Sequence, residues 1–298
     1  MSEIPYILGP MRVPFLILAP ACALLGIASA DWTAGSMQAL HIVLVLIGAV
    51  AAHISVNALN EYYDFVSGLD FKTQRTPFSG GSGTLPASPG KARYALITGW
   101  VALGIAALIG IYFVALWGLW LLPLGLLGII IILAYTPLLN RNVILCLVAP
   151  GLGFGTLMVM GSAFALTGSY SWTAFFASLV PFFLVSNLLL LNQFPDVDAD
   201  REIGRRTLPI TAGRKTAALV YGAFLLLTYL SIVLGVLLGY LPPLSLLGLG
   251  TLLLAVPAAM NAYRFADDIG KLIPAMGMNV LINILTPVLV AIGLFVGK

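Results

Sequence analysis

Residues 53–70 read HISVNALNEYYDFVSGLD and carry charged and amide side chains at the end of an apolar run. Positions 53, 57, 60 and 64 follow the spacing i, i+4, i+7 and i+11, which places their side chains on one face of a helix. This polar stripe consists of His53, Asn57, Asn60 and Asp64. Ionisable and amide side chains are costly at membrane depth and normally face a cavity or a partner. The stretch therefore predicts a polar cavity at the end of a membrane-spanning helix.

A second stretch of the same character, residues 192–207, reads NQFPDVDADREIGRRT. Asn192, Asp196 and Asp200 recur every four residues, so we expect them to stack along one helical face. Pro195 has no amide hydrogen to donate, and we expect it to kink the helix and leave the carbonyl oxygen of Leu191 free in the cavity. The acids of this stretch are therefore predicted to lie at a bend.

The two stretches are related by a constant offset of 132 residues. The pairs at this offset are Asn60 with Asn192, Asp64 with Asp196, and Asp70 with Glu202. This spacing predicts two related halves, about 1–140 and 141–298, within one domain that spans residues 1–298. The two polar stretches are expected to face each other.

The composition of the chain excludes an ordinary soluble protein. Of its 298 residues, 60% are hydrophobic and 8% are charged, against roughly a quarter charged in a soluble domain. The net charge of +3 is small, and Cys22 and Cys146 lie within apolar runs. These features indicate no nucleic-acid partner, no disulfide framework and no obligate protein partner. The chain is expected to be an integral membrane protein that contacts the lipid bilayer along its length and retains its first apolar run.

Nine apolar runs are long enough to cross a bilayer, which takes about 20 residues per helix. They cover approximately 13–30, 38–60, 94–113, 117–136, 143–166, 174–194, 216–238, 242–262 and 275–296. The predicted fold is an all-α integral membrane protein with nine transmembrane helices around a central cavity. The third and fourth runs are nearly continuous around 115–118, so a count of eight stays open.

Charge placement orients the predicted spans. With nine spans, 13 of the 14 lysines and arginines fall on one side, and only Lys298 lies opposite. The positive-inside rule makes the basic side cytoplasmic, which places the N-terminus there and the C-terminus on the other side. Ten of the 11 acids share the basic side, leaving only Asp31 opposite. The long loops 61–93 and 195–215 also belong to the basic side and are expected to form cytoplasmic caps.

The grouped carboxylate and amide oxygens of the two stretches are hard ligands of the kind that Mg²⁺ accepts, together with phosphate oxygens and water. A diphosphate fits between two acidic clusters when Mg²⁺ bridges them. Basic side chains beside the acids would bind its remaining oxygens. The candidates are Lys72, Arg75, Arg141, Arg205 and Arg206. The pattern favours diphosphate chemistry at the charged face, although Arg205 and Arg206 are equally compatible with simple membrane anchors.

The two motifs and the predicted topology resemble the UbiA superfamily of intramembrane prenyltransferases. Members of that family have nine transmembrane helices and two Asp-rich motifs, after the second and the sixth helix. NALNEYYDFVSGLD is closest to N-x-x-N-D-Y-x-D-x-x-x-G-x-D of the 1,4-dihydroxy-2-naphthoate branch, which makes menaquinone. NQFPDVDADREIGRRTL is similar to N-x-x-x-D-x-x-x-D followed by G-[KR]-[RK]-T. The resemblance implies Mg²⁺-dependent transfer of a polyprenyl group from an isoprenyl diphosphate to an aromatic acceptor.

The resemblance also implies roles for individual positions. The implied Mg²⁺ ligands are Asn60, Asp64, Asp70, Asn192, Asp196 and Asp200. Asn60 and Asn192 are also implied to contact the diphosphate, and Asp64 and Asp196 are the implied catalytic acids. Tyr135, in the Tyr-Thr-Pro segment after the fourth run, is implied to lie near the developing allylic cation.

Two positions depart from the family pattern: Glu61 stands where Asp is usual, and Phe154 stands where naphthoate enzymes often have Glu. The acceptor therefore stays open between 1,4-dihydroxy-2-naphthoate, 4-hydroxybenzoate, homogentisate and a lipid alcohol. A secondary transporter, with intramembrane acids and a Pro-broken helix, is the alternative from another class. His53 is more typical of an interhelical hydrogen bond than of a catalytic group. The Gly-rich residues 79–83 are interpreted as a flexible part of the cap.

Overall fold

The apolar runs fold into helices in the computed structural model, which describes residues 3–297. No strand occurs within these residues. Seven helices there are long and apolar enough to cross a membrane. They are Ala39–Val66 (α3), Pro89–Trp117 (η3, Pro89–Lys91, with α5, Ala92–Trp117), Val143–Thr167 (α7, Val143–Gly151, η6, Leu152–Leu157, and α8, Met158–Thr167), Trp172–Asn192 (α9), Arg214–Leu237 (α12), Pro243–Arg264 (η7, Pro243–Thr251, with α13, Leu252–Arg264) and Ile269–Val296 (α14). The chain is therefore an all-helical, multi-pass integral membrane protein.

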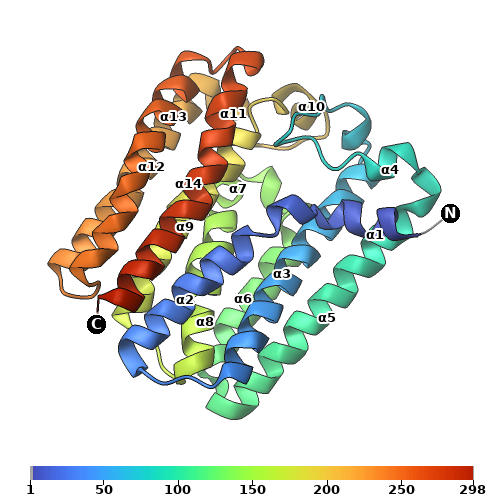
Figure 1. Cartoon of the computed structure of the whole chain (residues 1–298). Coiled ribbons are helices and arrows are strands. Elements are labelled where there is room, and N and C mark those ends of the chain that lie inside the picture. The colour runs from blue at the N-terminus through green and yellow to red at the C-terminus, as the bar shows by residue number, and fades with distance from the viewer. Residues whose placement is uncertain (1–2, 298) are drawn as a thin grey trace.

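The first predicted run is part of a bent pair of helices. Ile4–Met11 (α1) and Val13–Phe15 (η1) form one arm, and Leu18–Ala34 (α2) forms the other, at 52° to it. The left-handed backbone of Arg12, with φ at 51°, ends α1, and Pro14 follows. The bend lets α1 cross over α3 and α5 while α2 runs down into the bundle (Figure 1).

The fourth predicted run is shorter than the seven long helices. It comprises Leu119–Leu121 (η4) and Leu122–Ala134 (α6). Gly118, with φ at 87°, separates it from α5, which is the break expected in the nearly continuous apolar sequence. A positive φ costs glycine nothing, so the chain reverses here without strain.

The long helices lie side by side in one bundle (Figure 1). Helix α3 packs on α5, α2 packs on α8 and α14, and α9 packs on α12. Helices α4 (Thr84–Ala87), α10 (Val197–Glu202) and α11 (Leu208–Ala212) gather at one end of the bundle, shown at the top. The α2–α3 and α12–η7 connections lie at the other end.

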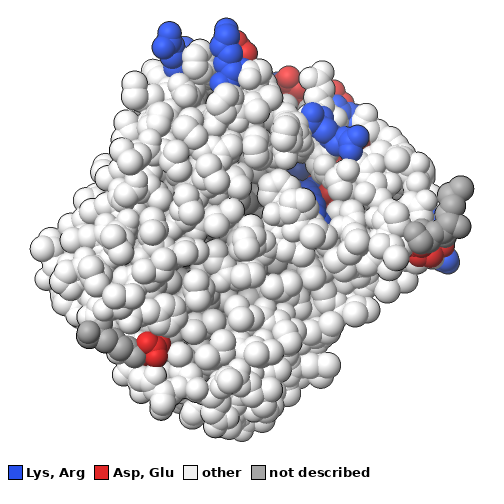
Figure 2. All heavy atoms as spheres, in the orientation of Figure 1, with Lys and Arg blue, Asp and Glu red and all other residues white. Residues whose placement is uncertain are grey.

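The charged side chains are concentrated at the end that carries α4, α10 and α11, as Figure 2 shows. One acidic group lies apart, near the other end of the bundle. Asp31 lies near the C-terminal end of α2, whose connection to α3 is at that end. Lys298, the lysine predicted for that opposite end, lies outside the described residues. The charged residues are therefore concentrated at one end of the bundle, as the placement of charges in the sequence predicts.

Helix α9 stops at Asn192, and the chain makes a turn before α10 begins at Val197. The expectation of a kinked helix with a free carbonyl at Leu191 is wrong, because that oxygen accepts the N–H of Phe194 at 3.2 Å. A residue that precedes proline is disfavoured in helical conformation, so Pro195 ends the helix before Phe194 instead of bending it. The turn is fixed by Arg214, whose Nε donates to the carbonyl oxygen of Phe194 at 2.9 Å.

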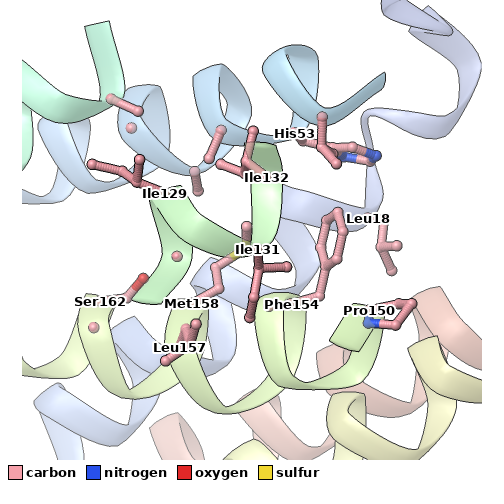
Figure 3. A pocket seen from close by; sticks show the side chains of 18 of the residues that line it. Leu18, His53, Ile129, Ile131, Ile132, Pro150, Phe154, Leu157, Met158 and Ser162 are labelled. Carbon is pink, nitrogen blue, oxygen red and sulfur yellow. The ribbon is translucent and has the colours of Figure 1, made fainter. Parts of the chain in front are cut away.

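The span Val143–Thr167 contains a π-helical segment, η6, between α7 and α8. Gly151 immediately before it and Gly155 within it lie directly against the backbone of α9 at Phe182, leaving no room for a side chain. Such wide turns interrupt α-helices mostly as single turns and often at functional sites. Here the turn carries Phe154 to the wall of a cavity, beside His53 (Figure 3).

Candidate active site

A polar cavity of about 100 Å³ lies at the charged end, where α3, the loop after it and the turn after α9 meet. Its walls include all six residues assigned as metal ligands from the sequence, together with Tyr135 and Arg205. These six are Asn60, Asp64, Asp70, Asn192, Asp196 and Asp200. The two motifs, 132 residues apart in the sequence, therefore face each other across one cavity, as predicted.

Arg205 joins the two motifs directly. Its Nη2 donates to Asp64 of the first motif, and its Nη1 donates to Oδ1 of Asp200 in the second at 2.9 Å. The guanidinium side chain is 13% exposed, so both ion pairs are shielded from water. Burial raises the pKa of Asp200, while Arg205 acts in the opposite direction.

Three carboxylate and amide oxygen atoms of residues that line the cavity have no hydrogen-bond partner among residues 3–297 although they are buried. They are Oδ2 of Asp70, Oδ1 of Asn192 and Oδ1 of Asp196. Burial raises the pKa of Asp70 and of Asp196 to about 7 each. A buried acceptor without a partner carries its full desolvation cost, so these atoms need a ligand.

The chemistry of these oxygen atoms fits Mg²⁺, which binds carboxylate and amide oxygens. Within the described part of the chain, no three His, Cys, Asp or Glu residues are close enough to enclose a metal ion by themselves. Mg²⁺ ordinarily takes one or two carboxylates and fills its remaining positions with water and phosphate oxygens. The site is thus suited to a metal ion that binds together with a phosphorylated ligand.

Glu61 differs from the neighbouring acids because protein groups satisfy its carboxylate. It is 1% exposed and accepts hydrogen bonds from Arg12 Nε at 2.7 Å, from the Ser82 N–H at 2.7 Å and from the Ser82 hydroxyl at 2.8 Å. It thereby ties the bend after α1 and the Gly-rich loop to helix α3. Glu61 has one more methylene than an Asp, which extends its carboxylate toward these partners.

Arg12 is a site residue that the sequence reasoning missed. Its side chain lines the polar cavity and donates from Nη2 to Oδ1 of Asn60 at 3.3 Å, in addition to the Glu61 ion pair. Its only sequence signal was a cation immediately before the first apolar run. A solitary charge at the start of a membrane helix is also what a simple anchor looks like, so sequence alone does not distinguish the two.

The Gly-rich loop that was interpreted as a flexible cap lies over the carboxylates. Ser79, Gly80 and Gly81 line the polar cavity, and the two glycines have φ values of 83° and 72°. A Cβ on Gly81 would lie 3.1 Å from Oδ1 of Asp70 and 3.3 Å from Oε1 of Glu61. The loop is held by the hydroxyls of Thr76 and Ser79, which are 2.9 Å apart. Only glycine allows the backbone to come this close to the acids.

Four of the five basic residues predicted to bind phosphate lie outside the walls of this cavity. Lys72 pairs with Glu202 at 2.7 Å on the exposed surface, and Arg75 donates to the carbonyl oxygen of Ser82 at 2.8 Å. Arg141 and Arg206 are exposed. Arg205 and Arg12, which the sequence did not point to, are therefore the cations in the wall of the polar cavity.

An apolar cavity of about 650 Å³ adjoins the polar one and extends down the bundle between α2, α3, α5, α6, η6 and α14. The two cavities share wall residues, namely Arg12, Asn60, Phe78, Tyr135, Leu189 and Asn192. Tyr135, which follows the end of α6, thus stands at the junction between them. Figure 2 shows the surface hollowed just below the charged end, with charged side chains visible inside. The arrangement suits a ligand with an anionic head and a long apolar tail.

The sequence is similar to known proteins over most of its length. The model of the UbiA prenyltransferase family matches residues 17–282. The 1,4-dihydroxy-2-naphthoate octaprenyltransferase of Bacillus subtilis (strain 168) is 30% identical over 223 residues, which are 74% of this chain and 69% of that protein. The UbiA prenyltransferase domain-containing protein 1 of Dictyostelium discoideum is 26% identical over 235 residues, 77% of this chain and 71% of that one.

Solved structures share the fold. The apo structure of a UbiA homolog from Aeropyrum pernix K1 superposes with a TM-score of 0.71 at 18% identity, covering 94% of this chain and 96% of that one. A UbiA homolog from Archaeoglobus fulgidus bound to DMAPP and Mg²⁺ gives a TM-score of 0.60 at 13% identity, covering 97% and 99%.

Proposed function

Because the chain belongs to the UbiA prenyltransferase family, and so is a prenyltransferase, we propose that it transfers a polyprenyl group from an isoprenyl diphosphate to an aromatic quinone precursor. The acceptor we propose is of the 1,4-dihydroxy-2-naphthoate type, the substrate class named for the Bacillus subtilis relative. The reaction would take place within the membrane and require Mg²⁺, which is bound with DMAPP in a structural relative.

The observation that carries this proposal is the set of unpartnered buried oxygens described above. Asp70, Asn192 and Asp196 each direct an oxygen that has no partner in the described chain into one small polar cavity, and a cavity of about 650 Å³ adjoins it. An isoprenyl diphosphate has a head that suits the first cavity and a tail that suits the second. Each methylene of the tail gains roughly 0.8 kcal/mol on burial in apolar surroundings.

We assign the metal-holding role to the six oxygen-bearing residues and the phosphate-binding role to the cations beside them. Mg²⁺ would be held by Asn60, Asp64, Asp70, Asn192, Asp196 and Asp200. When bound, it would neutralise the charge that develops on the leaving diphosphate. Arg205 and Arg12, the two cations in the cavity wall, would bind phosphate oxygens. Lys72, Arg75, Arg141 and Arg206 would attract the diphosphate to this end of the molecule from outside the cavity.

The transfer step begins when the bond between the allylic carbon and the diphosphate oxygen breaks, and the electron pair leaves with the diphosphate. Tyr135 stands where the two cavities meet, so its ring would stabilise the allylic cation, by about 2 kcal/mol when desolvated. A ring carbon of the aromatic acceptor then forms the new bond to this carbon, and the proton that the ring loses passes to the released diphosphate. The apolar walls exclude the water that would otherwise intercept the cation.

We further propose that the chain crosses the membrane nine times as one domain of two related halves, with the bent α1–α2 pair and the shorter η4–α6 segment counted as spans. The charged end that carries α4, α10 and α11 would face the cytoplasm and form the cap over the site. Helix α14 would then end on the opposite side. Attaching a thiol-reactive reporter to single cysteines introduced at position 142 or 240 tests the sidedness, because the two connections should label from opposite sides.

The function is tested by incubating the purified protein with geranylgeranyl diphosphate, with and without Mg²⁺, across a panel of acceptors. The panel comprises 1,4-dihydroxy-2-naphthoate, 4-hydroxybenzoate, homogentisate and a lipid alcohol. Diphosphate release and prenylated product are measured separately. We expect Mg²⁺-dependent product with the naphthoate. Product with another acceptor only would transfer the assignment to that acceptor, and no diphosphate release with any of them, from protein shown to be folded, would refute the proposal.

A further inference from the structure

His53 and Phe154 meet in the wall of the apolar cavity. The two ring centroids are 4.7 Å apart at an interplanar angle of 81°, an edge-to-face contact between α3 and the π-helical segment η6 (Figure 3). Both residues line the cavity. Phe154 cannot withdraw easily, because Gly151 and Gly155 hold its segment against the backbone of α9. The pair is therefore a fixed aromatic surface in a cavity that is otherwise mainly aliphatic.

The ring nitrogens of His53 lack hydrogen-bond partners among the residues that the structure describes. The side chain is 5% exposed, and Nδ1 is completely buried without a partner. No hydrogen bond from Nε2 is present within the same residues. A polar group buried in apolar surroundings without a partner is strongly unfavourable unless a ligand completes it. The interhelical hydrogen bond expected from the sequence is therefore not what keeps this histidine in the membrane.

A second histidine of the same helix shows what a structural histidine looks like here. His41 is 6% exposed and makes a similar edge-to-face contact with Phe113, at 5.5 Å and 73°. Its Nε2, however, lies 3.0 Å from the hydroxyl of Tyr112, and the residue is not part of the cavity wall. His41 is satisfied by protein alone, whereas His53 is not.

The position of His53 along α3 suits contact with the acceptor of the reaction. It precedes Asn60 by seven residues, which corresponds to about 10 Å along a helix axis. Asn60 lines both cavities, so His53 lies roughly the length of a fused aromatic ring below the polar site. An acceptor whose reacting carbon faces the allylic carbon near Asn60 would have its far edge beside His53. A further polar atom of this cavity, Oδ1 of Asn283 on α14, is also buried without a partner in the described chain.

We propose that His53 and Phe154 form the binding site for the aromatic acceptor, with a ring nitrogen of His53 hydrogen-bonded to an acceptor hydroxyl and Phe154 packed on the acceptor ring. The inference rests on the proposed function and assigns its acceptor subsite. The ligand class is a hydroxylated aromatic ring. His53 acts here as a positioning residue, since it orients the acceptor and takes no part in breaking the bond to diphosphate.

The test compares His53→Phe with the matched control His41→Phe in the purified, full-length protein. We expect His53→Phe to raise the acceptor KM by about tenfold, the loss of one hydrogen bond to a buried partner, and to leave the donor KM unchanged. His53→Gln, which keeps a hydrogen-bonding group, should recover part of the acceptor affinity. His41→Phe should lower thermal stability, because Tyr112 loses its partner, and leave the acceptor KM as in the unmodified protein. A KM that responds for the acceptor alone is not explained by a merely structural role.

Two further measurements keep the proposal open to refutation if His53→Phe folds poorly. Phe154→Leu removes the aromatic face and should also raise the acceptor KM selectively. An acceptor with one hydroxyl methylated should bind the unmodified protein more weakly, while His53→Phe should no longer distinguish it from the parent acceptor. Unchanged acceptor KM in both variants, or a rise in the donor KM instead, would overturn the subsite assignment. If the unmodified protein prenylates no aromatic acceptor, the proposed function itself fails and the subsite fails with it.

Discussion

Asp64 and Asp196 occupy corresponding positions in the two acidic motifs, yet their surroundings differ. Asp64 continues the helical face of α3 and is bound to Arg205. Asp196 lies in the turn after α9, and its Oδ1 has no partner among residues 3–297. Glu61, three residues before Asp64, is also engaged, because it accepts hydrogen bonds from Arg12 and Ser82. Asp64 and Glu61 of the first motif thus hold the surrounding structure together, whereas Asp196 of the second motif leaves an oxygen atom available to a ligand.

The largest effect is expected from Asp64→Asn and Asp196→Asn. Each should lower turnover by about 10²–10³-fold, because each removes a carboxylate proposed to hold the Mg²⁺ that neutralises the charge on the leaving diphosphate. Their effects on folding should differ. Asp64→Asn should lower the free energy of unfolding by about 1–3 kcal/mol because Arg205 loses a charged partner, whereas Asp196→Asn breaks no such ion pair. Turnover and thermal unfolding of the purified variants check both points, and near-normal turnover in both would refute the metal-site assignment.

A second comparison uses the third pair at the 132-residue offset, Asp70 and Glu202. Asp70 lines the polar cavity, whereas Glu202 is on the surface with its side chain 60% exposed. Asp70→Asn should lower turnover by about 10–100-fold, since an electrostatic group at the site is lost. Glu202→Gln serves as the matched control and should leave turnover unchanged. An equal loss of turnover in the two variants would show that the matching position in the two motifs, and not burial in the cavity, determines which acid contributes to turnover.

The third prediction concerns the structural part of the first motif. Glu61→Gln should lower the free energy of unfolding by about 2 kcal/mol, because the ion pair with Arg12 is shielded from water on the Glu61 side. The Gly-rich loop should then detach more often, which limited proteolysis near residues 79–84 would detect. Turnover should fall less than in Asp196→Asn. If proteolysis is unchanged, Glu61 does not hold the loop.

The smallest effect is expected from Lys72→Ala. The Lys72–Glu202 pair is exposed on both sides, with side chains 48% and 60% accessible, and such pairs contribute about 0–1 kcal/mol. Turnover at physiological salt should remain within about twofold of the unmodified protein. The measured salt dependence of the donor KM should become slightly weaker, because one distant cation is lost. A tenfold loss of turnover would place Lys72 in direct contact with the diphosphate.

The sequence predicted much of the fold because hydropathy acts locally. Each of the nine apolar runs is helical, and the break near Gly118 lies where it was expected. The stop of α9 at Asn192 was missed, since a proline in an apolar sequence is compatible with either a kink or an end. The π-helical segment at Leu152–Leu157 was also missed, because the sequence does not show that Gly151 and Gly155 lie against the backbone of another helix.

The acidic and amide residues of the site were predictable for a similar reason: buried polar side chains stand out in an apolar sequence, and their helical spacing is visible. The basic residues were not predictable in this way. Lys72 points to Glu202 and Arg12 points to Glu61, contacts that span 130 and 49 residues. A cation in a charged loop looks the same in the sequence whether it reaches the cavity or the solvent, so only the tertiary structure separates Arg205 from Arg206.

The π-helical segment Leu152–Leu157 constrains how this region can change over evolution. A wide turn of this kind amounts to one extra residue within an α-helix. Deleting a residue here would replace the wide turn with a regular helical turn and remove the local displacement that places Phe154 at the cavity wall. Homologous sequences should therefore substitute residues freely at position 154, and with them the ring that the cavity accepts, while conserving the length of the segment.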